Sequence, residues 1–264
     1  MRVSFLGASV YGVKCLKAVL KIVDLEIVGI MTTPKEFVLT YNAGKDSKTM
    51  KNDVYDEIYQ IGKDNGIPVF VIEKMNEKRT VDILLGWEPE LIVVSGWYHI
   101  IGAAIRNIPK YGVVGLHPSL LPKYRGGAPL VWQMINGENK AGITLFYMDQ
   151  GVDSGDIIAQ AEEIIEETDT IGTLYEKVGN SGIKLLEKYL PLIALGKAPR
   201  IKQEYLKDED IWPQRRPEDG LIDWSKSPRE IENFVRAQTK PYPGAYTIID
   251  GKKVIIWDCT VEDS

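Results

Sequence analysis

A loop of unusual composition holds one of only two histidines in the 264-residue chain. His117 opens the run HPSLLPKYRGGAP, which ends at Pro129 and contains three prolines and two glycines. Imidazole has an ordinary pKa of about 6.5, so it can accept a proton at neutral pH without being permanently charged. A rigid loop that a ligand can approach closely is not something that packing alone requires. The run therefore makes His117 the first candidate for a catalytic residue.

A second loop, residues 148–156, supplies carboxylates. It reads MDQGVDSGD, with acidic side chains at Asp149, Asp153 and Asp156. A carboxylate beside an imidazole can orient the ring and stabilise its charged form. A solvated turn would have a similar composition, so this loop gains meaning only if it lies near His117.

A third loop, Gly7 to Gly12, resembles a degraded dinucleotide fingerprint, GASVYG. Such turns let a phosphate approach a helix N-terminus, and Ser9 is a candidate contact. The acidic residue expected after the second strand is missing, since Met31, Thr32 and Thr33 stand there. A nicotinamide dehydrogenase is therefore disfavoured, and a plain strand-to-helix turn remains an equal alternative.

The first half of the chain alternates short β-rich runs with amphipathic stretches, which predicts an α/β, Rossmann-like, mostly parallel sheet. The expected strands are 3–6, 25–31, 67–72, 91–94 and 113–116. The expected helices are 13–23, 54–65, 78–85 and 100–106. His117 follows the fifth strand, at the carboxyl end of the sheet, where open α/β folds bind ligands. The polar segment 34–52 interrupts the alternation and is expected to be a long mobile loop that could close over the site.

Beyond residue 128 the order of elements changes. A helix at 129–135, strands at 142–147 and 157–165, and a long helix that Pro191 and Gly196 end are expected. We predict a catalytic domain over 1–196, a linker strap over 197–224 and a small C-terminal subdomain over 225–264. That subdomain is expected to be a helix, 227–238, and a β-hairpin turning at Asp250 and Gly251.

The overall composition limits the functional classes. The chain is 44% apolar and 26% charged, with 32 basic against 37 acidic residues and a net charge of −5. This disfavours general nucleic-acid binding. No apolar run is long enough for a membrane span and no leader is apparent, so we expect a cytoplasmic protein. Cys15 and Cys259 lie far apart without metal-ligand spacing, and no metal is expected.

Taken together, the HPSLLPKYRGGAP run and the later DQGVDSGD resemble the formyltransferases that use N10-formyltetrahydrofolate. The likeness covers residues 1–196, and RPEDGLIDW from Arg216 with PYPGAY from Pro241 looks like the start of that family's C-terminal domain. Nucleotide-amino-sugar N-formyltransferases are the most similar branch by these motifs. The resemblance implies the formyltransferase fold, with N10-formyltetrahydrofolate as co-substrate and a nucleotide-linked amino sugar as acceptor.

The resemblance also implies roles for particular residues. His117 would be the general base, with Asp153 as its carboxylate partner. The folate would lie against the loop after the fourth strand and against the acidic loop. By their own chemistry, Lys123 and Arg125 form an exposed basic pair that could meet a pyrophosphate of the acceptor, and a solvated surface pair is the alternative. A nucleotide base could stack on Tyr124, on Trp132 or on an aromatic residue of the tail. The expected folate-binding residues are Gly96, Trp97, Tyr98, His99, Ile100, Asp149 and Gly151.

One position departs from the family. An asparagine two residues before the histidine donates to the developing oxyanion in the family, and here that position is Gly115. Three interpretations follow: a water or backbone N–H substitutes, the enzyme is slow, or the protein binds its ligands without turnover. Methionyl-tRNA is the main alternative acceptor. It is disfavoured because residues 200–264 carry no basic excess. The apolar residues Phe234, Val235, Ile255 and Trp257 predict a homodimer.

Overall fold

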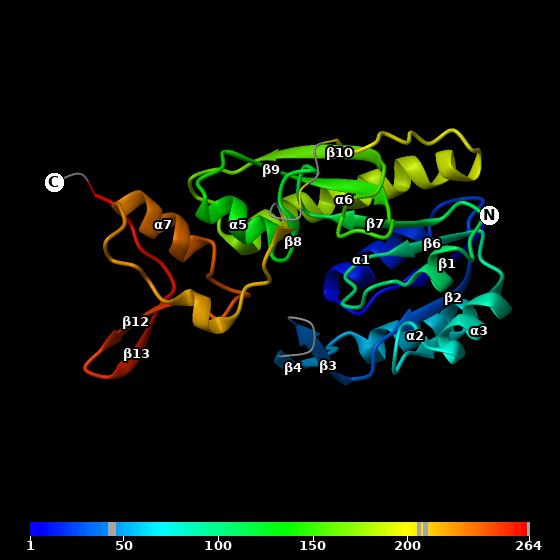
Figure 1. Cartoon of the computed structure of the whole chain (residues 1–264), viewed down its shortest axis with the longest axis horizontal. Coiled ribbons are helices and arrows are strands. Elements are labelled where there is room, and N and C mark those ends of the chain that lie inside the picture. The colour runs from blue at the N-terminus through cyan, green and yellow to red at the C-terminus, as the bar shows by residue number, and fades with distance from the viewer. Residues whose placement is uncertain (42–45, 205–206, 208–210, 263–264) are drawn as a thin grey trace.

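The protein is built around one seven-stranded sheet, seen in a computed structural model that describes residues 1–41, 46–204, 207 and 211–262 (Figure 1). The strand order is β10-β9-β7-β6-β1-β2-β5. The five strands from β7 to β5 are mutually parallel, and β9 and β10 run antiparallel at one edge. The bounds are β1 Arg2–Leu6, β2 Glu26–Thr32, β5 Val69–Val71, β6 Leu91–Val94, β7 Val113–His117, β9 Lys140–Tyr147 and β10 Ile157–Ile164. The predicted α/β fold is confirmed.

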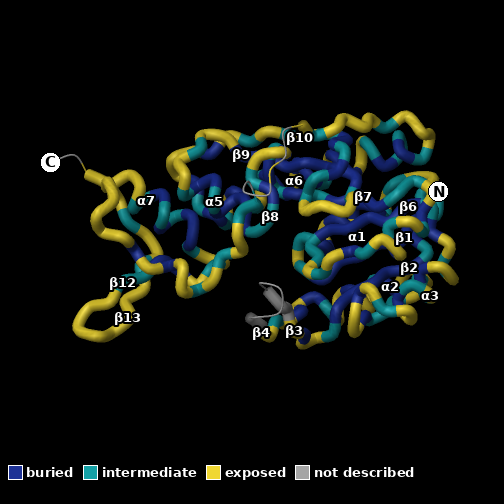
Figure 2. The backbone as a smooth tube through the Cα atoms, in the orientation of Figure 1, coloured by how far each residue is buried: buried dark blue, intermediate teal, exposed yellow. Residues whose placement is uncertain are grey.

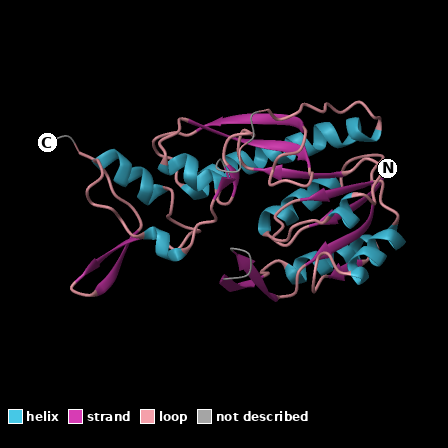
Figure 3. Ribbon diagram, in the orientation of Figure 1, coloured by secondary structure: helices cyan, strands magenta, loops and turns pink. Residues whose placement is uncertain are grey.

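Helices cover both faces of this sheet (Figure 3). One face carries the larger apolar core, to which α1, α2, α5 and α6 contribute, and the other a smaller core with α3 and α4. The helices are α1 Val10–Val19, α2 Tyr55–Asn65, α3 Lys78–Trp87, α4 Ala103–Arg106, α5 Pro129–Ile135 and α6 Ile171–Ala194. Continuous Val, Ile and Leu runs in β1, β6 and β7 are buried from both sides, as a parallel sheet requires.

The strand order reverses at β1. The chain passes from β1 to β2 on one side and later returns to β6 and β7 on the other. The turns after β1 and β6 meet at this reversal, where the Ala8 amide donates to the Gly96 carbonyl at 3.1 Å. Loops at such a switch point form the usual ligand crevice of an open α/β sheet. The loop that begins at His117 follows the next strand along.

The prediction of a loop over residues 34–52 is wrong. The segment forms a β-hairpin, β3 Glu36–Tyr41 paired antiparallel with β4 Asp46–Lys51; residues 42–45 lie outside the described residues. Phe37 attaches this hairpin to the rest of the protein. Its ring is 8% exposed and packs 5.4 Å from Tyr98 and 5.9 Å from His99, between ring centroids. The hairpin therefore packs against the loop after β6.

The prediction that Pro191 ends the long helix is wrong, whereas the stop at Gly196 is confirmed. Helix α6 continues through Pro191 to Ala194, and only then does Gly196 adopt a φ of 65°. A proline removes one backbone donor from a helix. Here Leu186, Leu190 and Ile193 remain buried along one face, so tertiary packing outweighs that local cost.

The C-terminal part has a small core of its own. It consists of the 3-10 turn Pro217–Gly220, α7 Pro228–Arg236 and a hairpin of β12 Ala245–Ile249 with β13 Lys252–Ile256. Ile222, Val235 and Ala245 are buried together, while the hairpin is mostly exposed (Figure 2). The predicted helix and hairpin are confirmed. Among the described residues, no helix has the length and apolarity needed to cross a bilayer.

Candidate active site

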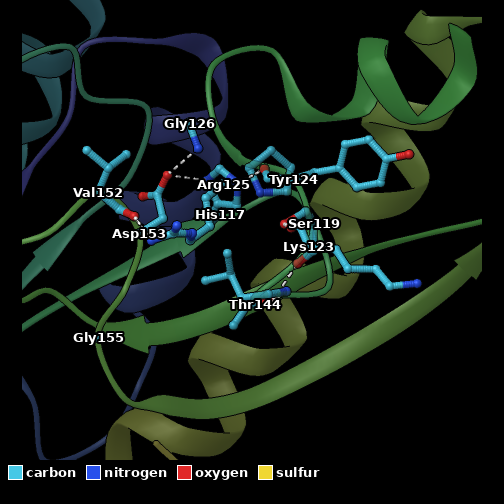
Figure 4. A network of polar contacts seen from close by, with 12 residues as sticks. His117, Ser119, Lys123, Tyr124, Arg125, Gly126, Thr144, Val152, Asp153 and Gly155 are labelled. Atoms are coloured by element: carbon cyan, nitrogen blue, oxygen red, sulfur yellow. Dashed lines mark hydrogen bonds and ion pairs between the residues drawn. The ribbon is translucent and has the colours of Figure 1, made fainter. Parts of the chain in front are cut away.

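The imidazole of His117 lies at the carboxyl end of β7, enclosed between two loops (Figure 4). Its Nδ1 is 3.4 Å from Oδ2 of Asp153, which belongs to the loop between β9 and β10. The two residues are far apart in the sequence, and the sheet brings them together because β7 pairs directly with β9. The side chains are 8% and 23% exposed, so the carboxylate faces solvent more than the ring does.

The other ring nitrogen of His117 is engaged by the backbone. Nε2 lies 2.8 Å from the carbonyl oxygen of Tyr124, and a carbonyl only accepts hydrogen bonds, so Nε2 carries the hydrogen. The nitrogen free to take up a proton is therefore Nδ1. From the sequence, Asp153 was expected to orient the ring and so to fix which nitrogen carries the hydrogen. In the structure Tyr124 does so, and Asp153 faces the nitrogen that would become charged.

One carboxylate oxygen of Asp153 makes both of its contacts at this site. Oδ2 accepts a hydrogen bond from the amide of Gly126 at 2.9 Å as well as facing the ring. Within the part of the chain that the structure describes, Oδ1 has no hydrogen-bond partner. An amine placed beside the ring could donate to this oxygen.

The backbone at both contacts of the ring is strained. Tyr124 has a φ of 55° and Asp153 a φ of 49°, both in the left-handed region that side chains with a Cβ rarely adopt. Each such residue costs about 1–3 kcal/mol and persists only where its surroundings impose it. Strain at both residues that touch one imidazole supports a functional role for this site.

Gly115 lies two residues before His117 on β7, and Met148 fills the space above it. A Cβ built on Gly115 would lie 2.3 Å from Cε of Met148. The methyl group of Met148 therefore occupies the space that a side chain at position 115 would need. The carbonyl of Val113 accepts from the Met148 amide at 2.8 Å, which fixes the backbone of Met148 to β7.

The expectation of an exposed basic pair is correct for Lys123 and wrong for Arg125. Arg125 is 3% exposed, and its guanidinium donates to the carbonyls of Val152, at 3.4 Å, and Lys207. It is buried because β8, Arg125–Gly126, pairs with β11, Ile211–Trp212. The arginine thus ties the two site loops to the strap. A phosphate contact from Lys123 stays a prediction.

Tyr124 is half-buried and packs against the strap. Its ring stacks on Trp212 with centroids 5.1 Å apart, and its hydroxyl donates to Glu138 at 2.8 Å. Burial raises the pKa of Tyr124 to about 12, so it stays a hydroxyl donor at neutral pH. Trp212 therefore covers one face of the Tyr124 ring, and stacking of a nucleotide base on Tyr124 stays a prediction.

The expected folate-binding loop after β6 presents aromatic groups beside the switch point. Trp97 and His99 make an edge contact at 5.7 Å, and Tyr98 and Ile100 are exposed. Burial lowers the pKa of His99, which favours the neutral form of its ring. The Nε1 of Trp97 is buried and has no hydrogen-bond partner in the described residues.

The remaining predicted contacts have clear local roles. Asp149 accepts hydrogen bonds from the Gly151 amide at 3.0 Å and the Ser154 hydroxyl at 2.6 Å, which closes the acidic loop. Ser9 caps α1 by accepting from the Gly12 amide at 3.1 Å. These roles leave ligand contacts from Ser9, Asp149 and Gly151 as predictions. No cluster of three or more potential metal ligands occurs among the described residues.

Sequence reasoning missed four residues at this site: Phe37, Met148, Gln203 and Trp212. Phe37 was overlooked because its segment is polar, and Gln203 carries no recognisable signal. Trp212 lies in a stretch rich in Pro, Trp and charge, which was a clue that the strap packs against something. Met148 opens the acidic loop, and only the carboxylates and glycines of that loop were singled out.

Two protein families and a curated relative match this chain, and all three are formyl transferases. The "Formyl transferase" family matches residues 33–190, and "Formyl transferase, C-terminal domain" matches residues 215–264. A methionyl-tRNA formyltransferase of Clostridioides difficile is 37% identical over 265 residues, covering 100% of this chain and 81% of that protein.

Solved structures agree on the fold. A 4-N formyltransferase from Francisella tularensis has a TM-score of 0.74 at 21% identity, with 100% of this chain and 98% of that chain covered. The sugar 3N-formyl transferase WlaRD, solved in the presence of dTDP and 5-N-formyl-THF, has a TM-score of 0.66 at 21% identity, with coverages of 97% and 85%.

Proposed function

Because the chain belongs to the formyl transferase family, we propose that it transfers a formyl group from N10-formyltetrahydrofolate to the primary amine of a nucleotide-linked amino sugar. The observation that carries this proposal is the placement of Nδ1 of His117 3.4 Å from the carboxylate of Asp153. Attack by an amine on a formyl carbon needs a base for the amine proton and a means of stabilising the resulting cation.

His117 and Asp153 fill these roles in sequence. Asp153 Oδ1 accepts a hydrogen bond from the incoming amine and aims its lone pair at the formyl carbon. Nδ1 of His117 takes the amine proton as the new C–N bond forms. The imidazolium then lies between the Tyr124 carbonyl and the Asp153 carboxylate, which both stabilise it. The same proton returns to N10 as the bond from N10 to the formyl carbon breaks.

The loop after β6 fits the folate. Bound there, the folate supplies an activated formyl group. Tyr98 and Ile100 offer an exposed aromatic and apolar surface for a flat ring. Nε1 of Trp97, which has no hydrogen-bond partner among the described residues, offers a donor after a small side-chain movement. The loop lies at the switch point, beside the strand that carries His117. Its side chains therefore suit a pterin next to the base.

Charge supports a small acceptor. The chain has a net charge of −5, and its C-terminal part carries slightly more acidic than basic residues. Binding tRNA depends on many contacts between cations and phosphates. A nucleotide sugar needs only a local donor set, to which the exposed Lys123 can contribute.

Methionyl-tRNA is the second candidate acceptor, and sequence identity favours it. The 37% identity over the whole chain is to a methionyl-tRNA formyltransferase, whereas the sugar enzymes share about one residue in five. Sequence identity thus favours methionyl-tRNA as the acceptor, whereas the net charge favours a nucleotide sugar. One experiment distinguishes the two acceptors.

The experiment offers N10-formyltetrahydrofolate with dTDP- and UDP-linked amino sugars, or with methionyl-tRNA, and measures the formylated product by mass spectrometry. Product from a sugar nucleotide that vanishes in His117→Asn supports the proposal. If methionyl-tRNA is the only substrate that gives product, it replaces the amino sugar as the acceptor. Folate binding without product for any acceptor, even in Gly115→Asn, identifies a binder that does not turn over.

A further inference from the structure

The strap, residues 197–224, attaches to both loops of the candidate active site. Its first attachment is to the acidic loop. Nε2 of Gln203 donates to the carbonyl of Asp153 at 3.0 Å and to that of Gly155 at 2.7 Å. Beside it, Ile201 and Ile157 exchange backbone hydrogen bonds of 2.8 and 2.9 Å. Gln203 thus fixes the backbone of the residue whose carboxylate faces His117.

The second attachment is to the histidine loop. Strand β11 pairs in parallel with β8, and the Gly127 amide donates to the Trp212 carbonyl at 2.8 Å. Gly126 has a φ of 93°, and a Cβ there would lie 2.5 Å from the Trp212 carbonyl oxygen. Glycine at this position is therefore what allows the strap to lie directly on the loop.

Side chains reinforce this attachment. Trp212 lies between two aromatic rings, with centroid distances of 5.1 Å to Tyr124 and 5.0 Å to Trp132. Nε1 of Trp132 donates to the carbonyl of Pro213 at 2.9 Å. Tyr124 is therefore held by Trp212 on its ring and by Glu138 at its hydroxyl, in a left-handed conformation it would not otherwise keep.

We propose that Gln203 and Trp212 are positioning residues that set the distance between His117 and Asp153. Trp212 holds Tyr124, whose carbonyl orients the imidazole, and Gln203 holds the backbone of Asp153. The ring lies between two acceptors on two separate loops, and the strap connects both loops to one segment. This inference rests on the proposed function, because it assigns the strap to the same reaction.

The variants Trp212→Ala and Gln203→Met remove one attachment each. We expect kcat to fall about 10- to 100-fold, since displacement of a catalytic group by about 1 Å has effects of this size, with little change in KM for the folate. Trp212→Phe keeps an aromatic ring on Tyr124 and should restore most of the rate. Matched controls are Trp224→Ala, at an exposed tryptophan that ends the strap and donates to Thr247, and Gln60→Met, at an exposed glutamine on α2; both should keep the rate.

A second measurement does not depend on activity. The chain contains two histidines, so the ring nitrogens give a simple 15N NMR spectrum, and His99→Gln assigns the signals. Trp212→Ala should move the Nε2–H signal of His117, because Tyr124 loses its support, whereas the signals of His99 should stay in place. Circular dichroism confirms that each variant remains folded.

The two readouts separate the possible failures. Unchanged His117 signals and unchanged kcat in folded Trp212→Ala and Gln203→Met variants would overturn the positioning role. If the unsubstituted protein formylates no acceptor, the proposed function fails, and the NMR comparison still decides whether the strap orients His117. An equal loss of rate in Trp224→Ala would indicate a general effect on stability and also count against the proposal.

Discussion

At the scale of single residues, the site depends on which atom of each side chain is free. Nε2 of His117 is used by the Tyr124 carbonyl and Oδ2 of Asp153 by the Gly126 amide, which leaves Nδ1 and Oδ1 for a substrate. The two groups therefore act as a unit, and removing either should cost nearly as much as removing both.

Asp153→Asn tests this unit. The amide keeps an oxygen for the Gly126 N–H but loses the negative charge that stabilises the imidazolium. We expect kcat to fall about 10²- to 10⁴-fold with little loss of folate binding. Steady-state kinetics and folate calorimetry measure both quantities. Asp156→Asn, which removes a carboxylate facing Arg200 at 3.7 Å on the same loop, is the control. Equal losses in the two variants would contradict the assignment.

The pair Gly115 and Met148 gives a second residue-scale prediction. An asparagine at 115 must displace Cε of Met148, which a flexible side chain allows at some cost. An oxyanion donor is worth about 2.7–4 kcal/mol in other enzymes. We expect Gly115→Asn to raise the rate of formyl transfer, and Gly115→Asn with Met148→Ala to raise it further. Met148→Ala alone is the control. A double variant no faster than that control would refute the alignment of this loop.

At the scale of elements, the sheet edge and α6 support the C-terminal part. Asp169 precedes α6 and accepts hydrogen bonds from Nζ of Lys177 at 2.6 Å and the Thr173 hydroxyl at 2.8 Å. Its carbonyl accepts from Arg236 on α7 at 3.0 Å. One buried carboxylate thus orders the helix start to which the C-terminal helix is attached.

This arrangement predicts a pH-dependent stability. Burial alone would raise the pKa of Asp169, but hydrogen bonds from Lys177, the Glu166 amide and Thr173 together lower it below its usual 3.8. The carboxylate therefore stabilises the fold above about pH 4, and this contribution is lost as the pH falls through the lowered pKa.

Asp169→Asn should reduce the free energy of unfolding at pH 7 by about 1–3 kcal/mol, measured by urea denaturation. The difference from the unsubstituted protein should shrink as the pH falls below about 4 and vanish below the lowered pKa of Asp169, where both side chains are neutral. Asp82→Asn is the matched control, since Asp82 also pairs with a lysine at 2.6 Å but is 53% exposed. Asp82→Asn should lower the free energy of unfolding by at most about 0.5 kcal/mol. A pH-independent loss in Asp169→Asn would exclude the charged interaction.

At the scale of the whole molecule, most side chains of the C-terminal hairpin remain exposed to solvent or only partly buried. Val235 is buried in the tail's own core, but Ile249 is 54% exposed, Ile255 42% and Trp257 41%. Exposed apolar residues gathered on one small element commonly mark an interface. The dimer expected from the sequence would therefore use the hairpin.

Sedimentation equilibrium tests this prediction. We expect twice the mass of a single chain for the unsubstituted protein and a single-chain mass for Ile249→Ser with Ile255→Ser. Val23→Ser, at an 80% exposed apolar residue outside the tail, should leave the mass unchanged. A single-chain mass without any substitution would rule out the dimer.

Local patterns in the sequence determined the strand and helix order and the candidates His117 and Asp153. Continuous apolar runs specify buried strands, and a loop after such a strand must lie at the sheet's carboxyl edge. Only the tertiary structure decided which atoms meet. The Tyr124 carbonyl, Met148 over Gly115, and Gln203 and Trp212 on the strap act through backbone positions and long-range packing, which leave no periodic trace in the sequence. The same reason explains the hairpin at 36–51 and the helix through Pro191, where contacts with distant residues outweighed local preference.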